Sequence, residues 1–393
     1  MNVVFLSPHF PPPIRQFLMR LRDEGAIVLG VADEPHDHLH DELRAALADY
    51  YRVGDMHHYD DLVRALGWLT HRHGRIDRIE SLNEHWLETD ARLRTDFNVP
   101  GIRMSGIARI KRKSVMKQVF GRAGIATARG RVCRTAAETR RLVAEVGYPV
   151  IAKPDVGVGA ARTYRLEDDA GLVAYLGDKP PLDYIVEEAI EGTLLTYDGL
   201  ADREGRVVFD SSLIYATSVL DVVQGGDMTY WIPRDIPDDL RAVGLRTVAA
   251  FDVRERPFHF EYFRRPDGRL VALEVNMRHP GGLTVDMWNY ANEIDIYRAW
   301  ARVVVHGTAE VATERPYACL WAGRKDGRRY GLDHHEALAR AGDRLVLHAR
   351  VEPVFAAAIG DDGFILRGPD LAELQAAAAD IQALAAGGDA PPG

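Results

Sequence analysis

The chain has 393 residues, of which 47% are hydrophobic and 27% charged, and its formal net charge is −9 at pH 7. This composition is typical of globular proteins, and the length predicts two or three domains. The negative balance argues against a general nucleic-acid binder, the lack of long apolar runs argues against a membrane span, and two cysteines are too few for a disulfide scaffold. We expect a cytoplasmic, enzyme-sized protein.

Short apolar runs alternate with helical patterns over the first hundred residues. The predicted strands lie at 3–7, 27–31 and 76–80. The predicted helices lie at 14–23, 41–49, 60–73 and 86–97. This alternation predicts a parallel sheet with right-handed crossovers. The turn after the first strand reads SPHFPPP and not G-x-G-x-x-G, so we expect no dinucleotide-binding unit there.

The pattern then becomes helical at 107–124 and 135–147, and Thr135 with Glu138 predicts a capping box. Strand-like runs dominate from 149 to 276. Hairpin turns are predicted at Gly205, Gly225–Gly226 and Asp267–Gly268.

The chain is helical again after residue 283, and its last part is mixed. Strands are predicted near 317–322 and 351–359, and a frayed tail from 387. The fold class expected from the whole pattern is a combination of α/β and α+β units.

A lysine precedes a glycine loop in the segment VIAKPDVGVGAAR at 150–162. A strand delivers Lys153, and Gly157 and Gly159 follow in the loop. Glycine lets backbone N–H groups approach phosphate oxygens closely, and the lysine could reach the α- and β-phosphates of a nucleotide. A hairpin with a surface lysine explains this segment, taken alone, about equally well.

The segment YIVEEAIEG at 184–192 runs from an apolar strand into glutamates. Glu187 and Glu188 could present a carboxylate and backbone groups to the edge of an adenine ring. For this segment by itself, a strand that ends in solvated acids is the simpler interpretation.

The most informative segment lies at 258–282, where two strands are joined by a turn. Glu274 and Asn276 are two residues apart, so both project from one sheet face, and a hairpin can bring Glu261 opposite them. Two carboxylates and an amide oxygen are hard ligands suited to Mg²⁺. Glu274 lies in the apolar run VALEV, where an unpaired carboxylate would be costly, which favours metal binding over a surface ladder of charges. Arg278 follows on the same side and could stabilise phosphoryl charge.

The order of these candidates along the chain resembles the ATP-grasp superfamily, closest to its carboxylate–amine ligase branch. The resemblance covers roughly residues 1–310 and implies the ATP-grasp fold. The implied domains are an N-terminal parallel α/β domain at 1–106, a small central lobe with the glycine loop at 107–190, and a C-terminal antiparallel lobe with the metal site at 191–310. Residues 311–393 are left as an α+β extension with a flexible tail.

The same resemblance implies a role for each matching residue. The implied nucleotide-binding residues are Lys113, Lys153, Gly157, Gly159, Glu187, Glu188, Ala189 and Glu191. Within this set, Glu187 and the backbone of Ala189 would contact adenine, and Glu191 would replace a ribose-binding acid that is missing from 193–195. The implied ligands for Mg²⁺, with Mn²⁺ as the alternative ion, are Glu261, Glu274 and Asn276. The implied catalytic residues are Arg278 and Lys153.

The implied reaction is ATP-dependent amide formation. A carboxylate attacks the γ-phosphate of ATP to give an acyl phosphate and ADP, and an amine then displaces phosphate. The expected partners are therefore small-molecule carboxylates and amines, not nucleic acid or a membrane. Two alternatives remain open, a carboxylase that activates bicarbonate and a non-catalytic ATP-binding regulatory module. The sequence also leaves the oligomeric state open, and it allows a homodimer.

Candidate substrate residues follow the predicted strand at 76–80. Asn83 and Glu84 lie there, and ligands bind at the carboxyl ends of parallel strands. Glu84 could hold a substrate ammonium group, or it could be an acid at a helix N-terminus. His259 shares a strand face with Glu261, and it completes this substrate set together with Arg278. The loop 222–231 is expected to contribute specificity, whereas histidines 36, 38, 40, 57 and 58 are interpreted as solvated side chains and not zinc ligands.

Overall fold

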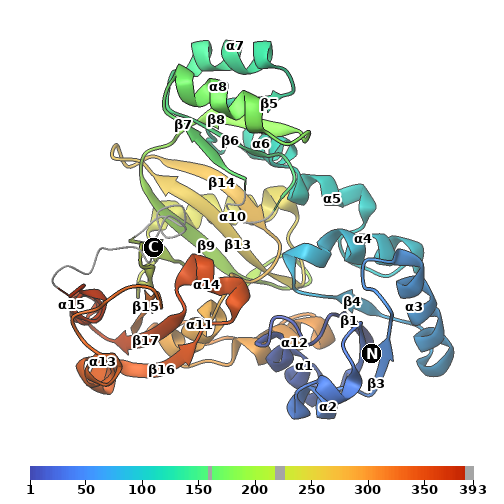
Figure 1. Ribbon diagram of the computed structural model, residues 1–393. Helices are drawn as coiled ribbons and strands as arrows, with labels where there is room; N and C mark the ends of the chain where they lie inside the picture. Colours follow the sequence, from blue (N-terminus) through green and yellow to red (C-terminus); the bar gives the residue numbers. More distant parts are fainter. Residues whose placement is uncertain (158–161, 217–225, 386–393) are drawn as a thin grey trace.

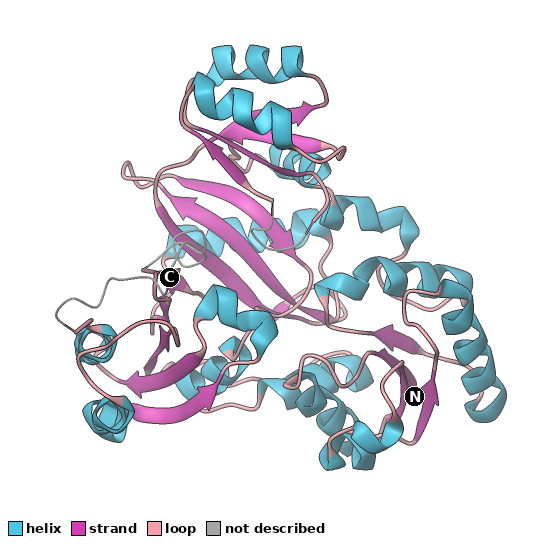
Figure 2. Cartoon of the chain, viewed as in Figure 1, coloured by secondary structure: helices cyan, strands magenta, loops and turns pink. Residues whose placement is uncertain are grey.

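The computed structural model describes residues 1–157, 162–216 and 226–385. Figure 1 shows a small upper lobe, a large central sheet and an N-terminal domain at the lower right. Helices flank the sheets of all these parts (Figure 2). Gly159, Gly225 and the tail predicted from 387 lie outside the described residues. In the ranges that are described, no helix is both long and apolar enough to cross a bilayer.

The N-terminal domain contains a parallel sheet in the order β3-β2-β1-β4. Its strands are β1 (Asn2–Leu6), β2 (Ile27–Ala32), β3 (Asp49–Arg52) and β4 (Arg78–Glu80). Its helices are α1 (Ile14–Asp23), η1 (His36–His38), α2 (Asp41–Ala46), α3 (Tyr59–His73), η2 (Glu84–Trp86) and α4 (Leu87–Asp96). The predicted parallel sheet is confirmed. The helix predicted to reach residue 49 was wrong at its end, because the chain becomes extended at Leu47 and then pairs with β2 as an edge strand.

The upper lobe is built on an antiparallel sheet in the order β5-β8-β6-β7. Its strands are β5 (Gly130–Cys133), β6 (Val150–Pro154), β7 (Tyr164–Leu166) and β8 (Tyr184–Glu188). Helices α5 (Met104–Lys111) and α6 (Lys113–Arg122) lead into the lobe, and α7 (Ala136–Val146) and α8 (Asp169–Asp178) cover its sheet. The single helix predicted over 107–124 is divided, because Arg112 adopts an extended conformation.

The predicted capping box at the start of α7 is confirmed. The hydroxyl of Thr135 accepts the N–H of Glu138 at 3.2 Å, and the Glu138 carboxylate accepts the N–H of Thr135 at 3.0 Å. Helix α8 was not predicted, although Asp168 caps it by accepting the N–H of Gly171 at 2.8 Å.

The described part of the large sheet has nine strands in the order β14-β13-β9-β11-β12-β15-β17-β16, with β10 paired to β9. The strands are β9 (Thr193–Ala201), β10 (Val207–Ser211), β11 (Ile214–Tyr215), β12 (Thr229–Ile232), β13 (Arg256–Arg264), β14 (Leu270–Asn276), β15 (Ala318–Arg324), β16 (Leu345–Arg350) and β17 (Asp362–Gly368). The associated helices are α10 (Asp238–Phe251), α11 (Thr284–Asn292), α12 (Ile296–His306), α13 (His334–Ala341), η3 (Gly342–Arg344), α14 (Pro353–Ile359) and α15 (Leu371–Gln382).

One expectation for this region was wrong, and two further features of it were not predicted. The strand predicted over 351–359 is helix α14, which begins with a proline at its first turn, a position that favours helix initiation. Periodicity alone does not separate a short apolar helix from a buried strand, and PVFAAAI is such a run. Helix α10 also interrupts the stretch in which strands were expected to dominate. The residues after 310 do not form a separate sheet, since β15 pairs with β12.

The N-terminal domain and the large sheet share one hydrophobic core. Phe17 of α1 packs edge-on against Tyr297 and Trp300 of α12, with ring centroids 4.8 and 5.2 Å apart. Phe17 also stacks on His279, 5.3 Å away, in the loop that follows β14. This packing fixes the carboxyl end of β14 against the N-terminal domain.

Candidate functional site

The β13–β14 hairpin presents the predicted acidic residues. Glu261 lies directly opposite Glu274 and His259 opposite Asn276, which confirms the expected pairing. The amide nitrogen of Asn276 lies 3.5 Å from Glu261 Oε1, so the side chains meet on one face. The side chains of Glu261 and Glu274 are 21% and 22% exposed, so both are open to a ligand while largely shielded from water.

Lys113, the first residue of α6, reaches this hairpin from the side of the upper lobe. Its Nζ lies 3.3 Å from Glu274 Oε2 and donates to the carbonyl of Gly157 at 3.2 Å. Burial alone would raise the pKa of Glu274, but Lys113, Lys153 and Arg278 together hold that pKa below its usual value. Glu274 is therefore an anion surrounded by cations, and Gly157 is tied to the same group of residues.

A second ion cluster, on β8 and β6, lies in the upper lobe. Glu187 is 4% exposed, and its two oxygens contact Lys153 Nζ and Lys117 Nζ, both at 2.7 Å. Burial disfavours the charge on Lys153, but Glu187, Glu274 and Glu261 outweigh it and raise the Lys153 pKa. Lys153 thus faces the acids of both lobes and stays protonated.

Lys117 is a residue that the sequence reasoning missed. It donates to the carbonyl of Ala128 at 2.6 Å as well as to Glu187. Burial lowers its pKa more than Glu187 raises it. The available signal was its spacing of four from Lys113 on α6, which places both ammonium groups on one helix face.

Part of the segment expected to contact adenine already makes hydrogen bonds within the protein. Glu188 accepts the N–H and the Nε of Arg129 at 2.7 and 2.8 Å. The N–H of Ala189 donates to Pro149, at 3.0 Å, so a backbone contact from Ala189 would come from its carbonyl oxygen. Glu191 is exposed.

His259 joins Glu261 to a buried aspartate. Its Nδ1 lies 2.7 Å from Asp198 Oδ1 and its Nε2 lies 3.2 Å from Glu261 Oε1, while Thr196 donates to Asp198 at 2.6 Å. Burial lowers the pKa of His259, but Asp198 and Glu261 outweigh it and raise that pKa to about 9. The imidazolium donates to both carboxylates and holds Glu261 in place.

The N-terminal domain contributes Glu84 at the same edge. Glu84 Oε1 lies 3.1 Å from Lys111 Nζ, and Glu84 Oε2 lies 3.4 Å from Arg278 Nε. Asn83 accepts the N–H of His85 at 3.0 Å and so caps η2. The acid after β4 therefore meets the arginine after β14, and two cations already neutralise it.

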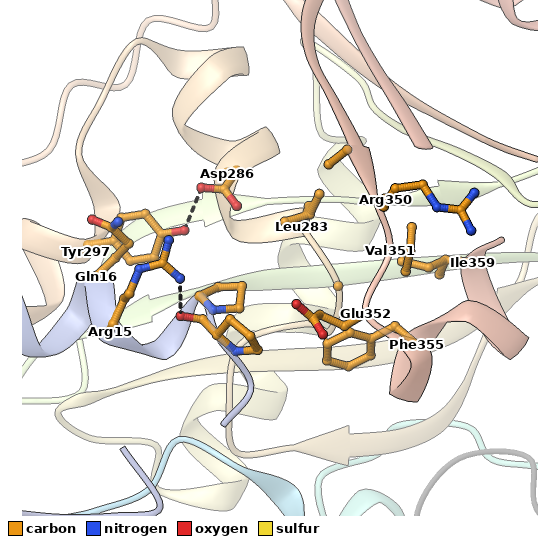
Figure 3. Close-up of a pocket in the computed structure, with 14 residues that line it drawn as sticks. Arg15, Gln16, Leu283, Asp286, Tyr297, Arg350, Val351, Glu352, Phe355 and Ile359 are labelled. Atoms are coloured by element: carbon orange, nitrogen blue, oxygen red, sulfur yellow. Dashed lines mark hydrogen bonds between the residues drawn. The ribbon is translucent and has the colours of Figure 1, made fainter. Parts of the chain in front are cut away.

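A separate cavity of about 210 Å³ adjoins the loop that follows Arg278 (Figure 3). Gly282 and Leu283 line it together with residues from the start of α1 and from α14. Its charged groups are Arg15, Asp286, Arg350 and Glu352. Asp286 accepts the hydroxyl of Tyr297 at 2.7 Å, and burial raises the pKa of Asp286. The cavity therefore combines carboxylates, guanidinium groups and apolar walls.

Residues 179–286 match the family model for the ATP-grasp domain. This part of the chain is therefore similar to ATP-grasp domains. The matched residues include Glu187, Glu261, Glu274, Asn276 and Arg278, and Lys113 and Lys153 lie before the match.

Curated relatives with related sequences share only part of their length with this chain. The carbamoyl phosphate synthase large chain of Mycobacterium sp. (strain JLS) is 27% identical over 195 residues, which cover 47% of this chain and 17% of the relative. The L-arginine-specific L-amino acid ligase of Bacillus subtilis is 26% identical over 245 residues, covering 57% of this chain and 59% of that ligase.

The fold is similar over nearly the whole chain to that of a solved L-amino acid ligase from Bacillus licheniformis. That structure aligns with a TM-score of 0.72 at 15% identity, and the alignment covers 97% of this chain and 96% of the ligase. The predicted ATP-grasp fold is therefore confirmed, and the structural likeness extends past residue 310, where the resemblance was expected to end.

Proposed function

We propose that the protein is an ATP- and Mg²⁺-dependent ligase that joins a small carboxylate to an amine. The observation that carries this proposal is the contact of Lys113 Nζ with Glu274 Oε2 at 3.3 Å, together with the lowering of the Glu274 pKa by Lys113, Lys153 and Arg278. Three cations around an acid that faces Glu261 and Asn276 suit the transfer of a phosphoryl group, because the transferred group carries several negative charges.

Lys113 and Lys153 would bind phosphate oxygens and neutralise them during transfer. Glu261, Glu274 and Asn276 would hold Mg²⁺, since their two carboxylates and one amide oxygen form a hard, partly buried donor set. When bound, the ion would supply Lewis-acid stabilisation of phosphoryl charge. Arg278, oriented by Glu84, would stabilise the carboxylate and the acyl phosphate.

The reaction would proceed in two balanced steps. A carboxylate oxygen attacks the γ-phosphorus, and the bond between that phosphorus and the ADP oxygen breaks. The amine nitrogen then attacks the acyl carbon, inorganic phosphate leaves, and the nitrogen loses a proton. Because acyl phosphates hydrolyse, water must be kept out, and the upper lobe that carries Lys153 is the part suited to cover the site.

The substrate class proposed for the carboxylate is an amino acid. The relative from Bacillus subtilis is an amino acid ligase, and the structural neighbour from Bacillus licheniformis is another. The cavity in Figure 3 provides the Arg15 guanidinium for a carboxylate and acids for an ammonium group beside the loop after Arg278, while Arg350 is already paired with Asp326. We also propose that Glu84 binds a substrate ammonium group, which would compete with its contacts to Lys111 and Arg278. The free cysteines Cys133 and Cys319 suit the cytoplasm, which we propose as the compartment.

The test is an ADP-release screen in the presence of Mg²⁺ over pairs of amino acids and simple amines, with mass spectrometry of each product. We expect ADP release that depends on both partners and a product whose mass equals their sum minus water. ADP release that needs bicarbonate and no amine would replace the proposal with a carboxylase. ATP binding without turnover over the whole panel would favour the regulatory module.

A further inference from the structure

Two histidines and one aspartate converge in the C-terminal part of the chain. His348 Nε2 lies 2.7 Å from Asp362 Oδ1, and His334 Nδ1 lies 3.5 Å from Asp362 Oδ2. The two imidazole rings meet edge to face, with centroids 4.7 Å apart. One ligand atom from each of the three side chains lies within 4.8 Å of the others.

The three side chains come from three elements that the chain brings together only in the folded state. His334 is the first residue of α13, His348 lies on β16, and Asp362 is the first residue of β17. These elements lie at the lower left of Figure 1, apart from the β13–β14 hairpin. The cluster is thus separate from the acids assigned to the ligase reaction.

We propose that His334, His348 and Asp362 bind a divalent transition metal ion of the Zn²⁺ class. Imidazole nitrogen with one carboxylate oxygen is a donor set that zinc accepts, whereas Mg²⁺ prefers oxygen alone. The fourth position would be filled by water, because the His334 side chain is 56% exposed and leaves the cluster open to solvent.

Two of the three separations between ligand atoms lie near those around such an ion, and the third is no longer than 4.8 Å. Bonds of about 2.0–2.1 Å in a tetrahedral site place ligand atoms about 3.3 Å apart. The His334–Asp362 separation of 3.5 Å is close to that value, and the 2.7 Å His348–Asp362 hydrogen bond would lengthen by several tenths of an ångström. Phe364 packs against both rings, with centroids 6.3 and 4.9 Å from His334 and His348, and it limits the other directions in which they can turn.

The bound ion would join α13 to the β16–β17 pair. Within the described residues, β16 is the last strand of the large sheet and pairs with β17 alone. An ion held by all three elements would stabilise this end of the sheet, since binding to the folded state alone raises the free energy of unfolding.

The test is a titration of the untagged, chelator-treated full chain with ZnCl₂ by isothermal calorimetry, in the presence of excess Mg²⁺ to occupy the acidic hairpin. We expect wild type to bind one equivalent of Zn²⁺ that His334→Ala and His348→Ala lose. Mutating a residue that only supports a metal ligand typically weakens metal affinity by ~10–100-fold. Removing a ligand itself, as in His334→Ala or His348→Ala, should weaken Zn²⁺ affinity by more than that. The same ZnCl₂ should raise the melting temperature of wild type and not that of the variants.

His335→Ala is the matched control, because His335 is the exposed neighbour of His334 on α13 and is outside the cluster. It should bind Zn²⁺ like wild type. A second control is His57→Ala. It breaks up the exposed imidazole pair His57–His85, whose Nε2 atoms lie 3.2 Å apart. Equal stoichiometry and affinity in wild type and in folded His334→Ala would overturn the proposal, as would loss of the site only in His57→Ala.

Discussion

The molecule contains two clusters of buried charge that differ in one respect. In the N-terminal domain, Glu80, Asp90 and Arg94 have side chains only 1–5% exposed. At the β13–β14 hairpin and just after it, the side chains of Glu261, Glu274 and Arg278 are 21–23% exposed. The first, sealed cluster is therefore almost inaccessible to solvent, whereas the second, open cluster is partly exposed.

The partners of the two clusters differ in the same way. Arg94 donates to the carbonyls of Ile79 and Ile102 at 2.9 and 3.2 Å, and to Glu80 at 3.0 Å. Protein acceptors therefore occupy its guanidinium donors. Glu274 is held by Lys113 across 3.3 Å. Buried charge by itself therefore does not mark a site, but buried charge with an open side does.

The largest expected effect follows from removing the charge at the open cluster. Glu274→Gln keeps the shape of the side chain and should abolish ADP formation, with a loss of several kcal/mol of transition-state stabilisation. The melting temperature should change little, because the backbone pairing of β14 is untouched. ADP release and thermal unfolding measured on one preparation check both parts, and substantial turnover in the folded variant would contradict the metal assignment.

The sealed cluster should respond in the opposite way. Arg94→Leu removes the 3.0 Å contact to Glu80 and leaves that acid only Arg256, at 3.4 Å, so it should lower the free energy of unfolding by about 3–5 kcal/mol. The KM for ATP should stay near its wild-type value below the new melting temperature. Urea unfolding and steady-state kinetics measure the two quantities, and a large rise in KM with unchanged stability would show that the two clusters are coupled.

Lys153 and Lys117 provide a matched pair near the open cluster. Both contact Glu187 at 2.7 Å, but the Coulombic field on Lys153 also includes Glu274 and Glu261. Lys153→Met should lower kcat by ~10²–10³-fold, as the loss of a charged stabiliser does elsewhere. Lys117→Met should act mainly on stability, since Lys117 ties Glu187 to Ala128. Nucleotide affinity by calorimetry separates the two, and equal losses would place Lys117 on the nucleotide as well.

The smallest effect concerns Asp90, whose pKa burial raises to about 7. Its Oδ2 accepts the hydroxyl of Ser81 at 2.7 Å, and its buried Oδ1 has no hydrogen-bond partner among the described residues. The unfolded side chain titrates near pH ~3.9, so between that pH and 7 the folded state holds more protons and wild type loses stability as pH rises. Asp90→Asn removes this slope, which is at most about 1.4 kcal/mol per pH unit. Urea unfolding of wild type and Asp90→Asn at pH 5, 6 and 7 checks this prediction. Free energies of unfolding that change with pH in the same way in both proteins would contradict it.

The sequence was most informative where the signal is local. Glu274, Asn276 and the turn before them lie within one hairpin, so their spacing settled which face they share. Lys117, the Glu84–Arg278 pair and the His334–His348–Asp362 cluster depend on elements that meet only through folding. Helix α14 and strand β3 were missed because short runs carry too little periodicity to choose between helix and strand.

The place of β12 in the large sheet has a consequence for any shortened form of the chain. Thr229–Ile232 pairs with β11 on one side and with β15 on the other. A chain cut after α12 would lose β15 and turn β12 into an edge strand, with a row of unpaired N–H and C=O groups beside the aromatic side chains of Tyr230 and Trp231. Such an edge invites strand pairing between copies, so the cut protein would self-associate instead of remaining a smaller monomeric unit.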